Sequence, residues 1–203
     1  MALFQNYLKK TIRPWQNCFG FTLTEVVSVL GLTVMIMVLI YNVFLISQKS
    51  FIKGDEKMEI TQNARILLDR LSRELRQTQE ITTALPSDKD QVGFPPAAEI
   101  MFQDGHDEQN IQYLRYYAIG ALIKRQKIVY FFSAEPDNYV KWNALDQFGQ
   151  PPNQSVIDEK DIAEYVSQMQ FYGDNLINID LSLIKNQSTS RFFTSIWGRN
   201  IGN

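Results

Sequence analysis

The feature that most constrains the fold of this chain is a run of 23 residues, 26–48, without a single charged side chain. As an α-helix rising about 1.5 Å per residue, the run is about 35 Å long, enough to cross a hydrocarbon core about 30 Å thick. One acid, Glu25, stands directly before it. A charge costs roughly 2.5–3.5 kcal/mol at the bilayer centre on insertion scales, so a simple anchor has no use for this carboxylate.

Residues 1–20 form a basic leader that ends in Gly20 and contains three positive charges and no acid: Lys9, Lys10 and Arg13. Positive charge beside an apolar span stays on the cytoplasmic side of the membrane. An ordinary secretory signal has an apolar core of about 7–15 residues followed by its small-residue cleavage site. Here the apolar run is longer and the small residue precedes it. A plain signal anchor is the simplest alternative, but it explains neither Gly20 nor Glu25.

The stretch Gly20-Phe21-Thr22-Leu23-Thr24-Glu25 resembles the processing site of type IV prepilins and pseudopilins. The resemblance implies cleavage between Gly20 and Phe21 and N-methylation of Phe21, both by a prepilin peptidase/methyltransferase. It also implies an assembly role for Glu25, the fifth residue of the mature chain. A buried carboxylate needs a partner, and the positive amine of Phe21 in a neighbouring subunit would pair with it and fix the axial register of a filament.

Charge and cysteine content limit the other functions. Subtracting the leader's three positive charges from the formal net charge of −2 leaves residues 21–203 at −5. This balance gives no general reason to expect nucleic-acid binding. The single cysteine, Cys18, lies in the leader, so the processed chain would contain no disulfide.

The helix is predicted to continue past the apolar run. No proline occurs between residues 14 and 86, so one helix of about 55–60 residues is predicted from Phe21 to near Ile81. Its second half is amphipathic, with apolar side chains three and four residues apart: Ala64, Leu67, Leu68, Leu71 and Leu75. The other side carries two i,i+4 pairs of opposite charge: Asp69 with Arg73, and Arg70 with Glu74. Gly54 is the predicted bend or local break.

After Pro86 the pattern changes to short extended runs typical of strands. The predicted strands are residues 99–102, 111–119, 121–132, 165–172, 175–184 and 192–197. Gly120 and Gly173 mark two hairpin turns. Over 177–183 apolar and polar side chains alternate, the pattern of a strand with one buried face. Residues 133–164 are rich in Pro, Asn, Asp and Gln and are predicted to be a long loop or insertion.

These elements predict an α+β fold in which one long N-terminal helix, transmembrane and then amphipathic, packs on an antiparallel β-sheet. The resemblance implies the same pilin-like architecture. The predicted divisions are a cleaved leader (1–20), the transmembrane and assembly half of the helix (21–48), its amphipathic half (49–82) and a β-sheet head (83–203).

Two further stretches are similar to one branch of the family. Residues 63–77 and, near the end, residues 193–200 are similar to J-type minor pseudopilins of type II secretion and equally to W-type minor pilins of type IV pili. This similarity implies a subunit that initiates or caps a pilus-like filament from the inner membrane. Its partners would be lipid and other pilins or pseudopilins, and its C-terminal domain would lie outside the cytoplasm. The similarity does not distinguish between a type II secretion system, a type IV pilus and a competence system.

No motif for catalysis or for a cofactor occurs in the chain. His106 is the only histidine, and there is no nucleophile elbow, phosphate loop or zinc-ligand spacing. We therefore expect no enzyme and no cofactor. Two acidic runs offer oxygen ligands for calcium: Asp104 with Asp107 and Glu108, and Asp158 with Glu159 and Asp161. Neither matches an EF-hand loop, so solvated acidic loops are the preferred interpretation.

A binding module is the main alternative of a different class. Aromatic side chains gather on the predicted strands: Tyr113, Tyr116, Tyr117, Tyr130, Phe131 and Phe132. Basic side chains lie near them: Arg115, Lys124, Arg125 and Lys127. Such aromatics stack on single-stranded DNA in some proteins, although they are also ordinary strand residues. The alternatives to a structural subunit are a pilus-tip adhesin or DNA-uptake module and a plain membrane-anchored domain, sensor or enzyme.

Overall fold

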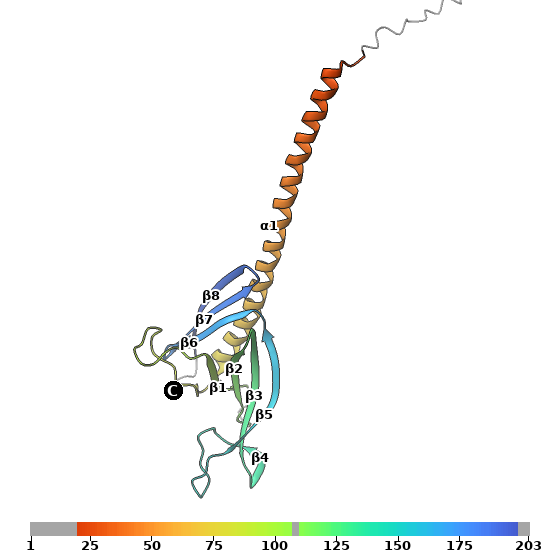
Figure 1. Ribbon diagram of the computed structural model, residues 1–203. Helices are drawn as coiled ribbons and strands as arrows, with labels where there is room; N and C mark the ends of the chain where they lie inside the picture. The colour runs from red at the N-terminus through yellow and green to blue at the C-terminus, as the bar shows by residue number, and fades with distance from the viewer. Residues whose placement is uncertain (1–19, 107–109, 199–203) are drawn as a thin grey trace, which may run out of the picture. The chain divides into compact units, whose positions relative to one another are not determined.

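The computed structural model describes residues 20–106 and 110–198 of the 203-residue chain. The chain divides into two compact units, residues 1–50 and residues 51–203. The first contains the apolar part of a long helix, and the second contains the rest of that helix with the eight strands of the described ranges (Figure 1). Apart from Gly20, the predicted leader lies outside the described residues, and so do Cys18 and the three basic leader side chains.

One α-helix, α1, runs from Leu23 to Gln77 over 55 residues, which confirms the predicted single long helix. The helix ends before Ile81 because Thr78 turns the chain. The buried Thr78 hydroxyl donates to the carbonyl of Gln103 at 2.7 Å. The helical backbone continues through Gly54, so the local break predicted there is absent.

In the first unit, α1 exposes apolar side chains on all sides. The exposed apolar residues of its helix range from 45% exposure for Val26 to 82% for Leu23. By length and composition, α1 is able to cross a membrane. Three polar side chains in the run donate to the carbonyl four residues earlier, at 2.7–2.9 Å: Ser28, Thr33 and Asn42. These bonds satisfy polar groups within the helix itself, which suits a hydrocarbon environment.

The second unit contains two antiparallel sheets. The first has five strands: β1 (Glu99–Gln103), β2 (Tyr113–Ile119), β3 (Leu122–Phe132), β4 (Glu135–Tyr139) and β5 (Asn153–Ala163). β1 to β4 pair in that order, and β5 pairs with β3. The second sheet has the order β6-β7-β8, with β6 at Val166–Tyr172, β7 at Leu176–Lys185 and β8 at Ser188–Trp197. Each strand predicted from the sequence is present, and so are both hairpins.

The sequence predicts one sheet, and the head contains two. Between β5 and β6 the chain turns at Tyr165, whose φ of 65° lies in the left-handed region. This turn redirects the chain, so β6 begins a new sheet instead of extending the first. Backbone bonds still link the parts: Val166 N–H donates to the Ala121 carbonyl at 3.0 Å, and Ala97 exchanges two bonds with Phe171 of β6.

The prediction of a long loop over residues 133–164 is wrong. β4 and the eleven-residue β5 lie within it, so only residues 140–152 connect strands as a loop. β5 lies at the edge of its sheet with most of its side chains exposed, and therefore lacks an apolar alternation that would mark it as a strand. Its charges lie opposite charges of β3 instead, as in the pair Lys124↔Asp161.

The core of the second unit lies between α1 and the two sheets. The predicted helix stripe is confirmed, except that Leu68 is only partly buried and Ile60 joins the stripe. The fully buried helix residues are Ile60, Ala64, Leu67, Leu71 and Leu75. They form one cluster with side chains of both sheets, including Phe102 of β1 and Leu181 of β7. This helix face therefore covers apolar surface that the sheets would otherwise expose to water.

Candidate functional site

The predicted processing site lies at the start of α1. Gly20 and Phe21 precede the helix, and Phe21 is 81% exposed. A Cβ built on Gly20 would meet nothing within 4 Å. Among the described residues, then, no side chain or backbone segment shields the Gly20–Phe21 bond.

Thr22 and Glu25 close the first helical turn as a capping box. The Thr22 N–H and the Thr22 hydroxyl both donate to Oε2 of Glu25 at 2.9 Å, and the Glu25 N–H donates back to Thr22 Oγ1 at 3.3 Å. With Leu23 as the first helical residue, Thr22 is the N-cap and Glu25 the N3 residue of a Thr-x-x-Glu box. The pattern Thr22-Leu23-Thr24-Glu25 shows this box directly in the sequence, although it was not among the predicted features.

The capping box fixes where the Glu25 carboxylate lies. It folds back toward the N-terminal end of α1, where the helix dipole favours negative charge. Both bonds from Thr22 go to Oε2, so Oε1 remains able to accept a further donor. Of the described neighbours in sequence, the next charged residue is Lys49, at the far end of the apolar run. Among the described residues, therefore, no cation close to Glu25 in the sequence is available to pair with it.

The other residues predicted from the sequence do not come together as a site. The exposed His106 has Nδ1 2.5 Å from Oδ1 of Asp104, whose side chain is buried, while Asp107 and Glu108 lie outside the described residues. Lys124 of β3 holds both Glu159 (2.7 Å) and Asp161 (3.4 Å) of β5. Asp158 pairs with Lys160 at 3.0 Å. Within the described ranges, no group of three or more His, Cys, Asp or Glu side chains is arranged to hold a metal ion.

Two of the six aromatic side chains are not available to stack on bases. Tyr113 and Tyr116 are fully buried, and Tyr113 packs edge-on against Tyr130 at 5.3 Å between ring centroids. The nearby cations are held by carboxylates: Arg115 by Glu99, Lys124 by Glu159, Arg125 by Glu74 and Lys127 by Asp104. The arrangement is that of a folded core with a paired surface, so no observation favours nucleic-acid binding.

Glu74 joins the helix to the first sheet. It forms the predicted pair with Arg70 (3.3 Å), but its side chain is only 10% exposed, so the expectation that it lies on the outer side is wrong. Tyr116 donates to Glu74 at 2.5 Å and Arg125 pairs with it at 3.1 Å. Burial, reinforced by this carboxylate, raises the pKa of Tyr116. Such a satisfied network orients the helix on the sheet and offers no free acid or base.

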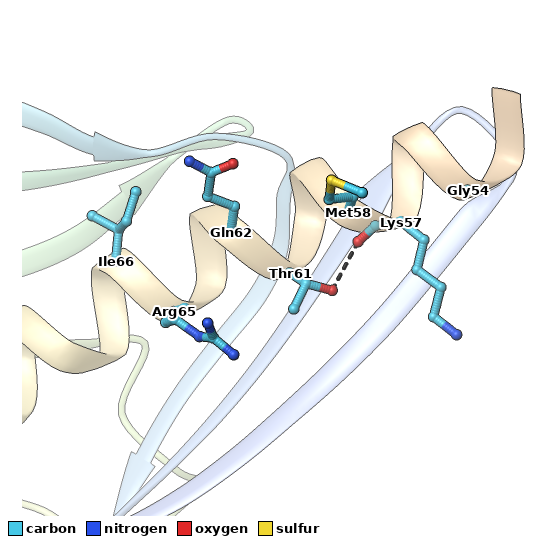
Figure 2. A pocket seen from close by; sticks show the side chains of 7 residues that line it. All are labelled: Gly54, Lys57, Met58, Thr61, Gln62, Arg65 and Ile66. Atoms are coloured by element: carbon cyan, nitrogen blue, oxygen red, sulfur yellow. Dashed lines mark hydrogen bonds between the residues drawn. The ribbon is translucent and has the colours of Figure 1, made fainter. Parts of the chain in front are cut away.

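Two hollows on the second unit are large enough to hold a small molecule. One lies on α1 and is lined by helix side chains alone: Gly54, Lys57, Met58, Thr61, Gln62, Arg65 and Ile66 (Figure 2). All of its lining residues come from one stretch of the helix (Figure 2), and Met58 (68%) and Ile66 (51%) are exposed. The other lies beside residues 146–153, where Asp146 accepts the N–H groups of Phe148 and Gln150 at 2.8 Å. Neither brings catalytic groups together.

Comparison with known proteins identifies no relative of this chain. No protein-family model, no curated protein and no solved structure matches the chain.

Proposed function

We propose that this chain is a minor pilin or pseudopilin, a structural subunit that helps to initiate or cap a type IV pilus-like filament. The observation that supports this proposal best is the combination of features at the start of α1. The unobstructed Gly20–Phe21 bond lies just before α1, and the acidic N3 residue lies in its first turn. The apolar side chains that follow are exposed, and the helix is long and apolar enough to cross a membrane. A plain anchor accounts for the apolar helix, and the capping box accounts for an acid in its first turn. Neither accounts for the glycine directly before Phe21 in combination with that acid.

In this proposal the chain is made as a single-pass protein of the inner membrane. The basic leader stays in the cytoplasm and the strand-containing unit lies outside it. A prepilin peptidase/methyltransferase cuts between Gly20 and Phe21 and methylates the new amine. The helix, exposed on all sides, then exchanges lipid for the helices of neighbouring pilins or pseudopilins. The outer face of α1 at residues 54–66, which carries Met58 and Ile66, supplies further apolar surface for such neighbours.

Glu25 is the residue proposed to set assembly. Its Oε2 is engaged by Thr22, and its Oε1 remains available for the positive amine of a neighbouring Phe21. A charge pair of this kind, buried among apolar helices, is favourable at one axial register only, because any other leaves a carboxylate unpaired.

Processing is tested by mass spectrometry of the N-terminal peptide after expression with a prepilin peptidase. The proposal expects a chain that starts at N-methyl-Phe21. A chain that still carries residues 1–20 would refute it and leave a plain membrane-anchored domain. A crosslinked pull-down of the mature protein from native membranes then assigns the machine. Recovery with other small pseudopilins and a secretin indicates type II secretion, and recovery with a major pilin indicates a type IV pilus.

Assembly is tested by two variants of one residue. Glu25→Gln keeps the capping box, because glutamine also serves at N3, but it removes the charge. Glu25→Ala removes both. Both variants should be processed normally. If charge pairing sets the register, both enter filaments poorly; if Glu25 is only a cap, Glu25→Gln assembles as the wild type does.

A further inference from the structure

The strand β8 presents an open edge of ten residues. Its only backbone pairing in the described part of the chain is with β7, over an unbroken register from Lys185↔Ser188 to Leu176↔Trp197. The other edges are blunted in ways that proteins commonly use. The loop at residues 80–83 covers β1, Ala97 covers part of β6, β4 is short and contains Pro136, and β5 carries four consecutive charges and two register shifts.

The hairpin geometry shows which backbone groups of β8 face outward. Residues 186 and 187 form a two-residue turn, so Lys185 and Ser188 form the hydrogen-bonded pair that closes it. Hydrogen-bonded and non-hydrogen-bonded pairs alternate along an antiparallel ladder. Every second residue therefore directs its N–H and C=O away from β7: Thr189, Arg191, Phe193, Ser195 and Trp197.

The same five residues carry their side chains on the outer face of the sheet, because they alternate with Ile196 and the other inward residues of β8. Phe193 is 59% exposed and Trp197 65% exposed. Arg191 is the only charged residue among them, and Asp180 on β7 already holds it, with Nε at 2.7 Å from Oδ1. The edge thus presents free backbone donors and acceptors together with two exposed aromatic rings. It presents no unpaired charge.

We infer that β8 receives an extended strand from a different polypeptide, which extends the β6-β7-β8 sheet. Only another extended backbone matches a row of donors and acceptors spaced in this way. The matching strand is uncharged where it faces Phe193 and Trp197 and carries apolar side chains there.

A second copy of this chain fits the edge less well. Two β8 strands paired antiparallel about a two-fold axis would reverse the direction of residues 51–77 of α1 in the second copy. Chains anchored in one membrane require that this segment leave the membrane in the same direction. The inference rests on the edge of the second unit, and the choice of a different polypeptide over a second copy rests on the proposed membrane anchoring but not on the proposed filament role.

The test is photo-crosslinking in the full chain, in native membranes of cells that make it. p-Benzoylphenylalanine at position 193 should give a discrete adduct, which peptide mapping assigns to a segment of a different polypeptide. The same probe at Gln168, exposed on the outer face of β6 at the other side of the sheet, is the matched control and should give no such adduct.

Backbone pairing is separated from side-chain contact by two variants of Ser195. Ser195→Pro removes one outward N–H and the hydroxyl bond to Asn178 of β7 (2.7 Å), but no backbone bond to β7, and should lower the adduct at least tenfold. Ser195→Ala loses the same hydroxyl, keeps the N–H and should retain the adduct. Thr189→Pro is the second proline variant, and tryptophan fluorescence of the purified full chains checks that each variant is folded.

Three outcomes overturn the inference: no adduct at position 193, an adduct with a second copy of this chain, or an adduct that folded Ser195→Pro leaves unchanged. The N-terminal peptide is read in the same samples. An uncut leader would refute the proposed function and leave the β8 result standing.

Discussion

At the residue scale, Gly105 occupies a position that leaves no room for a side chain. It follows β1 and lies against the last residue of α1: a Cβ on Gly105 would stand 1.8 Å from the carbonyl oxygen of Gln77. Gly105→Ala should therefore force the turn away from the helix end and lower the free energy of unfolding by roughly 1–3 kcal/mol. Thermal unfolding of the full chain in detergent micelles, followed by near-ultraviolet circular dichroism, measures the change.

The same substitution at Gly54 is the control. Gly54 lies within α1, and an added Cβ meets nothing within 4 Å. Gly54→Ala should raise stability by up to about 1 kcal/mol, because alanine is the better helix former. Equal effects at the two positions would contradict the close approach of Gly105 to Gln77.

Asp180 makes the stability of the head depend on pH in the acidic range. Arg191 first, and Lys89 next, hold the pKa of this buried carboxyl at about 2, below its ordinary value of 3.8. The folded state binds the proton less readily than the unfolded state, so the stabilisation is complete above pH 4 and is lost as the pH falls toward 2. It amounts to about 2 kcal/mol. Unfolding curves between pH 7 and pH 2 measure it.

Asp180→Asn separates this residue from the other acids. The variant should be less stable than the wild type at pH 7 and should lose less stability between pH 4 and pH 2. A wild-type curve that is parallel to that of Asp180→Asn over this window would show that Asp180 does not titrate as argued.

Sequence reasoning identified Glu25 from its position but not its contacts. A lone acid before an apolar run is visible in the sequence, whereas the bonds from Thr22 depend on where the helix begins. Asp180 was missed for another reason. It occupies a polar position of an alternating strand, but Lys89, 91 residues away, lies over it at 2.6 Å, and no local pattern shows a partner at that distance.

At the element scale, the contact between α1 and β3 contains a buried ion pair. Arg125 of β3 is 8% exposed and meets Glu74 of α1 at 3.1 Å. Glu74→Met would leave a buried guanidinium without its carboxylate, which typically costs 3–5 kcal/mol. Arg125→Met should destabilise the protein similarly, because it leaves the carboxylate with Arg70 and Tyr116 alone. Chemical denaturation of each single variant measures both losses.

The double variant Glu74→Met/Arg125→Met is the informative comparison. Because it removes both charges at once, it should be more stable than either single variant, giving a coupling energy above about 1 kcal/mol in a double-mutant cycle. Additive losses would mean that the two side chains do not interact in solution.

Elements were predictable where burial leaves a periodic pattern. The α1 stripe repeats every three or four residues and β7 every two, because each buries one face. β5 buries almost none of its side chains, so its polar composition is indistinguishable from that of a loop. Its strand state depends on backbone pairing with β3 and on matched charges such as Lys124 and Glu159, which only the folded arrangement brings together.

At the scale of the whole molecule, the chain separates an apolar helical segment, long enough to cross a membrane, from a folded head. Every buried apolar residue in the described ranges lies between Ile60 and Ile196, and the apolar half of α1 contributes none. The functional residues proposed here follow the same division. Gly20, Phe21 and Glu25 lie in the first unit, and the open edge of β8 lies in the second. Processing can therefore change the first unit without altering the core of the second.

This division predicts that residues 51–203 fold without the apolar segment. Because no core residue is lost, the fragment should be soluble and should unfold within a few degrees of the full chain in micelles, with the same cooperativity. The fragment does lose helical turns before residue 51, so its first turn should fray. A fragment that starts at residue 61, which lacks the buried Ile60 and the bonds from Glu56 and Glu59 to the β7–β8 hairpin, is the matched comparison. It should be clearly less stable. If both fragments were unfolded, the apolar segment would have to stabilise the head, and the two units could not be treated as independent.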